Sequence, residues 1–179
     1  MEHNEIDGYC ALAIALAQHD APQLRVPDPA PTPDTAPQSV APCTLLRALT
    51  ESSDSRAREA KIALFLRHPE YHQYVPSLTA ELSTPAALTL CHFYTAAVYL
   101  QHLWRSTLGL YLGAFAELPN YFGENEFGLP SPRLHWGESG LRRLATLFER
   151  ETGVEWLSVY ESAIARFFTQ QEARAAVTL

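Results

Sequence analysis

Four histidines in this sequence offer the nitrogen ligands that a metal site needs. His68 and His72 stand four residues apart, so on a shared helix both imidazole rings would project from one face. His92 and His102 lie in a later apolar stretch and could meet the first pair only through folding. The pattern gives a possible metal at His68 and His72, but it favours hydrogen-bonded or surface histidines, because two ligands make no catalytic site without a third.

Arg67 and His72 form a second constellation, an Arg-x4-His pair. Its spacing is similar to that of helical ribonuclease toxins of the HEPN class. The resemblance implies that both side chains sit near phosphate and promote attack by a 2′-hydroxyl. Pro69 falls inside the pair and departs from the continuous helix that this chemistry needs.

No other segment carries a strong catalytic pattern. Ser139 follows Gly137 and Glu138, but no strand precedes it and the G-x-S-x-G elbow is not formed. No glycine-rich phosphate loop is present in the sequence. These observations leave enzymatic activity uncertain, weigh toward binding or scaffolding, and specify no cofactor.

The composition describes one folded domain with few charges. The chain has 179 residues, of which 47% are hydrophobic and 18% charged, and these values exclude a wholly disordered protein. Its net charge is -7 and it has no basic cluster, so a nucleic-acid partner is not expected. Lys61 is the only lysine beside many arginines, which we interpret as a codon bias typical of bacteria.

The cysteines and the N-terminus favour a cytoplasmic protein. Cys10, Cys43 and Cys91 are odd in number and form no C-x-x-C pair, so reduced thiols are expected. The first residues are acidic, unlike the start of a secretory signal. The uncharged stretch 87–104 is interrupted by histidines and a glutamine, and we expect a buried helix there and no membrane span.

The hydrophobic periodicity predicts an all-α, single-domain bundle of about five to seven helices. Residues 1–19 should form an N-terminal helix, 20–43 a proline-rich linker and 44–179 the helical bundle, together one compact domain. Seven prolines between Ala21 and Pro42 exclude a helix or a central strand in that segment. Further helices are expected over 44–49, 56–67, 77–82, 140–152 and 154–176.

A long hydrophobic helix should occupy the centre of this bundle. Thr84 and Pro85 form a strong helix start, and the next stop signal is Pro119. The apolar residues between them are too dense for a one-faced surface helix, so several elements must cover it. Gly109 and Gly113, four residues apart, predict a kink or a close helix contact.

The segment 118–138 reads as a loop that is rich in aromatic residues. Prolines and glycines interrupt it, and it carries Tyr121, Phe122, Phe127 and Trp136. Such a loop either packs back on the core or binds something. Because binding surfaces favour aromatic anchors, we predict that these four residues form a partner-binding surface.

The C-terminal half resembles the all-helical chaperones of the TorD/NarJ type. Tyr111 to Phe115 is similar to that family's Tyr-x-x-Leu-Phe helix end, and a loop with proline and aromatics follows. Leu134 to Glu138, before a helix that ends at Gly153, is similar to the family's Leu-x-x-Gly-Glu helix. The diagnostic Asp-His motif is absent after Gly153. The resemblance implies a role in the maturation of molybdenum redox enzymes.

Three functional hypotheses follow from the sequence. The leading one is a non-enzymatic protein-interaction module, such as an assembly factor, maturation chaperone or accessory subunit, whose partner is another protein or a second copy of itself. The first alternative is a small-molecule- or metal-binding helical bundle, possibly enzymatic, that uses His68, His72, His92 and His102. The second alternative is the ribonuclease of Arg67 and His72.

Overall fold

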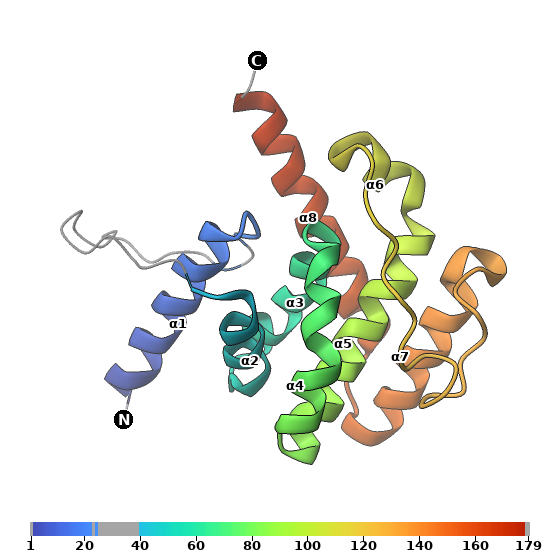
Figure 1. Ribbon diagram of the computed structural model, residues 1–179, viewed down its shortest axis with the longest axis horizontal. Helices are drawn as coiled ribbons and strands as arrows, with labels where there is room; N and C mark the ends of the chain where they lie inside the picture. Colours follow the sequence, from blue (N-terminus) through green and yellow to red (C-terminus); the bar gives the residue numbers. More distant parts are fainter. Residues whose placement is uncertain (1, 23, 25–39, 178–179) are drawn as a thin grey trace.

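The computed structural model describes the backbone of residues 2–22, 24 and 40–177, and the side chains of residues 10–22, 24 and 40–176 (Figure 1). Helices alone make up the regular structure of these ranges, with no strand. The predicted linker 20–43 lies mostly outside the described residues. The α-helices are α1 (Glu2–Gln18), α2 (Pro42–Glu51), α3 (Ser55–Arg67), α4 (Val75–Glu81), α5 (Thr84–Leu103), α6 (Arg105–Leu112), α7 (Glu138–Thr152) and α8 (Trp156–Val177), with 3-10 helices η1 (Pro69–Tyr74) and η2 (Leu134–Gly137).

The all-α bundle predicted from the sequence is confirmed. The described residues form eight α-helices, slightly more than the five to seven expected. The excess arises because the central apolar stretch is divided into α5 and α6. None of the described helices is long and apolar enough to cross a membrane, and this agrees with the interpretation of residues 87–104 as a buried helix.

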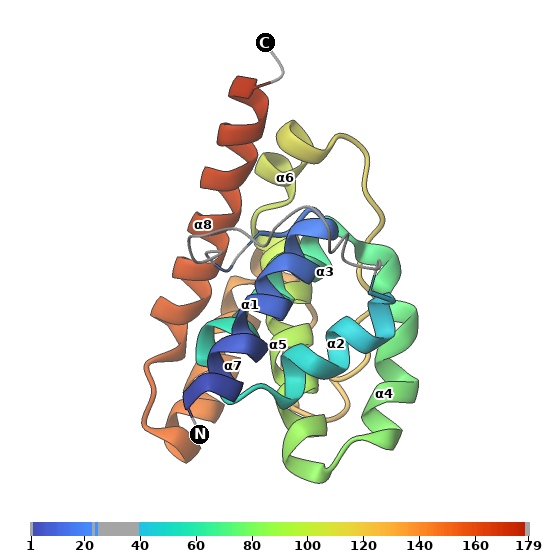
Figure 2. The same ribbon diagram turned by 90° about the vertical axis from the view of Figure 1, so that its left-hand side faces the viewer.

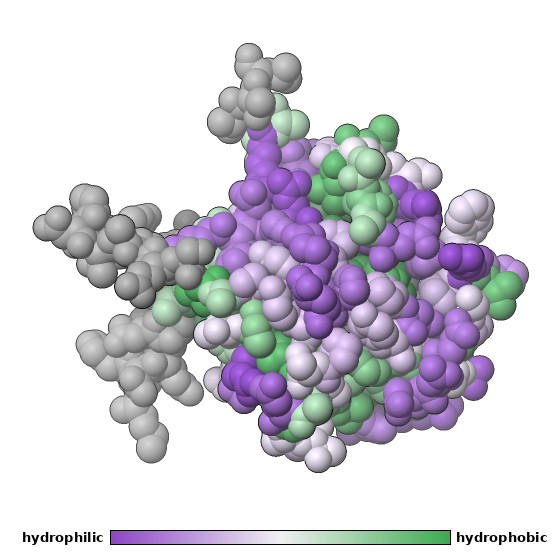
Figure 3. All heavy atoms as spheres, in the orientation of Figure 1, coloured by the Kyte–Doolittle hydropathy of each residue, from purple (hydrophilic) through white to green (hydrophobic). Residues whose placement is uncertain are grey.

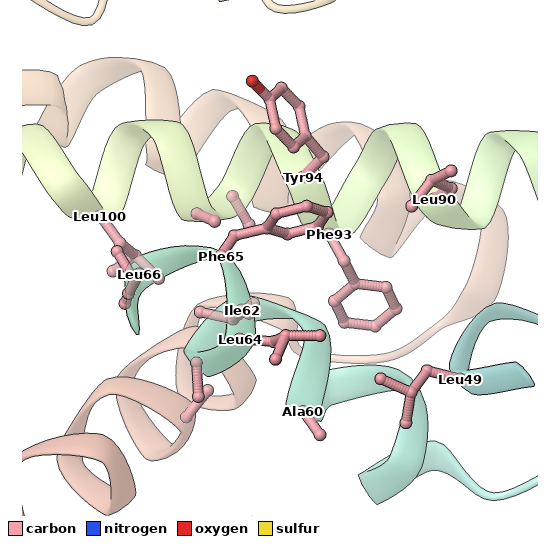
Figure 4. Close-up of a cluster of buried hydrophobic side chains, with 14 of the residues drawn as sticks. Leu49, Ala60, Ile62, Leu64, Phe65, Leu66, Leu90, Phe93, Tyr94 and Leu100 are labelled. Atoms are coloured by element: carbon pink, nitrogen blue, oxygen red, sulfur yellow. The ribbon is translucent and has the colours of Figure 1, made fainter. Parts of the chain in front are cut away.

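Helix α5 runs through the middle of the bundle in both views of Figures 1 and 2 and packs against α2, α3, α4, α7 and α8. Every residue from Leu90 to Gln101 is buried, so this helix has no solvent face along three turns. Figure 4 shows Phe93 of α5 pointing toward α3 and Phe65 of α3 reaching up to α5, where its ring lies 5.0 Å from that of Tyr94. Each fully buried Leu, Ile or Phe in this interface contributes about 1.5–3 kcal/mol relative to an exposed one.

The central helix ends earlier than the sequence suggested. Trp104, at φ -106° and ψ 19°, separates α5 from α6, and α6 then ends at Gly113, whose φ is +70°. The rings of Trp104 and Tyr111 lie 5.5 and 5.7 Å from that of Phe168 on α8. The break therefore turns α6 onto α8, and of the two predicted glycine positions only Gly113 changes the chain direction.

Helix α3 begins with a side-chain cap, whereas α2, α4, α5, α6 and α7 begin without one. Asp54 caps α3 by accepting a hydrogen bond from the Ala57 amide at 3.0 Å. Gly153, at φ +69°, ends α7 in the left-handed conformation that glycine adopts without strain. Helix α7 begins with Gly137 at its N-cap, and no side chain caps it.

Polar side chains of α5 hold the long connection between α6 and α7. The Tyr94 hydroxyl donates to the carbonyl of Pro119 at 2.7 Å, and the Tyr99 hydroxyl donates to that of Pro130 at 2.6 Å. The Gln101 side chain donates to the Ala116 carbonyl at 3.0 Å and accepts from the Leu118 amide at 2.8 Å. These bonds satisfy backbone groups that would otherwise be buried without partners.

Three glycines let the backbone approach Tyr99 closely. A Cβ added at Gly140 would lie 2.0 Å from a ring carbon of Tyr99, and one at Gly123 would lie 2.8 Å from its hydroxyl oxygen. At Gly137, φ is +86° and a Cβ would lie 2.8 Å from the Tyr99 carbonyl oxygen. Helix α7 and the connection before it thus pack against α5 at distances that only glycine permits.

Replacing Gly140 with alanine should therefore destabilise the fold. The added methyl group has no room beside a fully buried ring, and we expect a loss of about 1–3 kcal/mol in the free energy of unfolding. Gly109→Ala is the matched control, because a Cβ there meets nothing within 4 Å, and it should gain about 0.5–1 kcal/mol. Urea unfolding measures both, and a Gly140→Ala protein as stable as wild type would contradict this packing.

Candidate functional site

The aromatic side chains of the segment 118–138 do not all face solvent. Tyr121 is half-buried, its ring stacks on Tyr94 of α5 at 5.6 Å, and its hydroxyl is hydrogen-bonded to Nδ1 of His72 at 2.7 Å. Phe122 meets the ring of Tyr94 edge to face at 5.9 Å. These two predicted binding residues thus take part in the packing of the bundle.

The other two predicted binding residues, Phe127 and Trp136, differ in how far their side chains are exposed to solvent. The ring of Phe127 is half-buried and lies 5.5 Å from that of Phe148 on α7. Trp136, in contrast, is 74% exposed and stands beside Leu134, which is 54% exposed. Of the four predicted partner-binding residues, only Trp136 presents most of its side chain to solvent.

The backbone around Trp136 is unusual. His135 and Trp136 have φ values of +49° and +56°, so two consecutive residues other than glycine adopt the left-handed conformation. Each such residue costs roughly 1–2 kcal/mol. Gly137 follows, with its backbone pressed against the carbonyl of Tyr99. The close contact fixes the chain on α5 while the two preceding side chains point outward.

Arg133 extends this exposed segment. Its guanidinium lies 3.7 Å from the carboxylate of Glu117, and its side chain is 81% exposed. We name residues Arg133, Leu134, His135 and Trp136 the exposed corner; it lies at the start of α7, at the right-hand edge of Figure 1. Of this corner, only Trp136 was among the four residues predicted to bind a partner, and the exposure of Leu134 is evident only in the structure.

His68 takes part in a network that ties the end of α1 to η1. Its Nε2 is hydrogen-bonded to the carbonyl of His19 at 2.7 Å, and its ring stacks on Tyr71 at 4.8 Å. The two nitrogens of His19 contact the Tyr71 hydroxyl at 2.7 Å and the Val40 carbonyl at 2.8 Å. His68 thus has the hydrogen-bonding role that the sequence favoured.

Neither the predicted metal pair, His68 and His72, nor the predicted ribonuclease pair, Arg67 and His72, converges on one site, because each side chain contacts a different partner. His68 binds the His19 carbonyl, His72 binds Tyr121, and Arg67 lies 3.8 Å from the carboxylate of Asp20. Helix α3 ends at Arg67, so the Arg-x4-His pair does not share one helix. Within the described side chains, no group of three His, Cys, Asp or Glu residues could hold a metal ion.

His92 is the most deeply buried of the histidines predicted to act in chemistry. It is 3% exposed, its ring stacks on Phe148 at 3.7 Å, and its Nε2 lies 2.5 Å from the hydroxyl of Tyr160. Burial, aided by the charge of Lys61, lowers the pKa of His92 to about 3. The ring is therefore neutral at physiological pH.

His102 lies on the same helix but at its other end. It is half-buried, and an added Cβ at Gly137 would lie 3.3 Å from the Cβ of His102. Burial also lowers its pKa. Because His92 packs on Phe148 near the end of α7 and His102 packs near its start, the structure does not bring them to one site.

The burial of His92 should make stability depend on pH. The unfolded chain takes up a proton near pH 6.5, whereas the folded chain does so only near pH 3. The stabilising contribution is therefore complete above pH 6.5 and is lost as the pH falls, by at most about 1.4 kcal/mol for each pH unit. Urea unfolding of wild type and His92→Gln between pH 4 and 7 measures the slopes. The unfolding free energy of wild type should change more steeply with pH than that of the variant, by an amount that corresponds to the uptake of up to one proton. Equal slopes would contradict a neutral buried ring.

Comparisons with known proteins identify no family, relative or structural neighbour for this chain. Family models, curated proteins and solved structures were all searched, and none matches the chain.

Proposed function

We propose that this chain is a helical protein-interaction module, of the assembly-factor, chaperone or accessory-subunit kind, whose exposed corner anchors another protein. One observation carries the proposal: Trp136 is 74% exposed on a backbone held in the left-handed conformation. A large apolar ring in solvent gains no burial energy from the fold of its own chain. The strained backbone gives no evident benefit to the isolated fold either, so both features point to a partner.

The chemistry of the exposed corner fits a protein partner. Trp136 and Leu134 offer apolar surface, and Arg133 offers a guanidinium at its edge. Tryptophan and arginine are the side chains that most often dominate the energetics of protein interfaces. The contact of Gly137 with α5 holds the corner in place before binding, which lowers the ordering cost of association.

The experiment compares two exposed side chains in a quantitative pull-down. Leu110 on α6, where hydrophobic atoms reach the surface in Figure 3, is 85% exposed and lies outside the corner, so Leu110→Ala is the control for Trp136→Ala. Tagged wild type from the native host should retain one dominant protein at near-equal amount. Trp136→Ala should reduce that protein at least about tenfold, because anchor residues contribute about 2 kcal/mol or more.

Thermal unfolding accompanies the pull-down, and Trp136→Ala should leave Tm within 2 °C of wild type because the ring is exposed. Equal retention by Trp136→Ala and Leu110→Ala would contradict the proposal. So would a wild-type protein that retains no partner. A partner that proves to be a second copy of the chain would place the same corner in a homo-oligomer.

A further inference from the structure

A cleft opens at the end of α7 that is remote from the exposed corner. Its volume is 470 Å³, within the range of about 300–1,000 Å³ found for small-molecule sites. His92, Phe93 and Trp156 line its apolar interior. Leu88 and Val154 also line it and are 43% and 40% exposed, so they form an apolar mouth. The cleft thus combines a solvent opening with an aromatic interior that contains one imidazole.

The hydrogen bonding of His92 determines which nitrogen carries the proton. Burial raises the pKa of the Tyr160 hydroxyl, which therefore stays protonated. Its partner in the described structure is Nε2 of His92, so the hydroxyl donates to that nitrogen. The hydrogen of the neutral ring then resides on Nδ1, which forms no hydrogen bond with the described residues. An imidazole donor to which no described residue is hydrogen-bonded thus lines the cleft.

The electrostatics of the α3 wall add a positive charge. Arg58 lines the cleft, is half-buried and has no carboxylate within 4 Å among the described residues. Glu59 also lines the cleft, and its carboxylate is paired with Arg166 at 2.8 Å, which balances its charge. Glu151 also lines the cleft but is exposed, where water and salt weaken its field. A guanidinium near an unpaired imidazole donor favours a ligand with an anionic acceptor.

Lys61 lies beneath this site. It is fully buried, with Nζ 4.9 Å from the centre of the Phe93 ring and 3.4 Å from the Leu49 carbonyl oxygen. Burial and the charge of Arg58 lower the pKa of this amine well below its usual range. No carboxylate of the described residues lies within 4 Å of it. A negative charge placed in the cleft would raise the pKa of this amine toward its usual range.

We propose that the cleft binds a planar aromatic carboxylate. The ring of the ligand lies against Phe93 and Trp156, its carboxylate accepts the Nδ1 hydrogen of His92, and Arg58 pairs with its charge. The flat apolar walls fit an aromatic ring, while the donor and the guanidinium fit a carboxylate. This site is independent of the proposed protein interaction, since no residue of the exposed corner lines it.

Isothermal titration of the full chain at pH 7 tests the proposal with two probes of nearly equal shape. The probes are 2-naphthoate, which carries the carboxylate, and 2-naphthalenemethanol, which is neutral. The naphthoate should bind at one site about tenfold more tightly, the factor expected for hydrogen bonds to a charged group. Equal affinities, or no naphthoate binding at millimolar concentration, would overturn the proposal.

Two variants and one control locate the binding. Arg58→Gln should remove the preference for naphthoate, whereas Arg56→Gln, an exposed position on the same helix, should leave it unchanged. Val154→Trp at the exposed mouth should block both probes without disturbing the core. Circular dichroism confirms that each variant is folded. Retained preference in Arg58→Gln, or unchanged binding in Val154→Trp, would overturn the assignment to this cleft.

Discussion

The structure depends on polar side chains that α5 carries into the interior of the bundle. A buried hydroxyl or amide without a partner costs roughly 1–3 kcal/mol, so Tyr94, Tyr99 and Gln101 each require one. The connection between α6 and α7 supplies one backbone carbonyl to each of the three, and the Leu118 amide to Gln101 as well. The same bonds provide hydrogen-bond partners for backbone groups of the connection, which has little regular structure of its own. Helix and connection therefore stabilise each other.

The position of α7 follows from this arrangement. Gly137 and Gly140, at its start, pack on Tyr99, while Phe148, near its end, packs on His92. Helix α7 thus runs antiparallel to α5 and places the exposed corner and the aromatic cleft at opposite ends. With a rise of 1.5 Å for each residue, the two regions are separated by roughly 20 Å. One pair of helices can then support a protein contact and a ligand site that do not overlap.

The helices could be predicted from the sequence because hydrophobic spacing and capping residues are local signals. The density of apolar residues after Pro85 correctly indicated the central helix, although that helix ends at Leu103, before the predicted stop at Pro119. The direction of the loop aromatics could not be predicted. Tyr121 faces inward because it meets His72, which is 49 residues away in the chain. Such partners become neighbours only through folding.

The candidate sites show the same division between local and distant signals. Trp136 could be predicted as a binding residue because it is an aromatic residue in a loop. The left-handed backbone of His135 and Trp136 could not be predicted, since neither residue is glycine. His92 was recognised as a possible functional residue for metal binding, whereas its partner Tyr160 lies 68 residues away. Arg58 was not recognised, because an arginine on an amphipathic helix looks like any solvated charge.

Hydrogen exchange of the Leu118 amide tests the central claim most directly. This amide donates to the side chain of Gln101 and belongs to no helix, so its protection depends on the bond between α5 and the connection. We expect this amide to exchange at least about a thousandfold more slowly than the amide of exposed Glu124 in the same connection. Exchange of both amides at similar, unprotected rates would contradict the claim that α5 holds this connection in place.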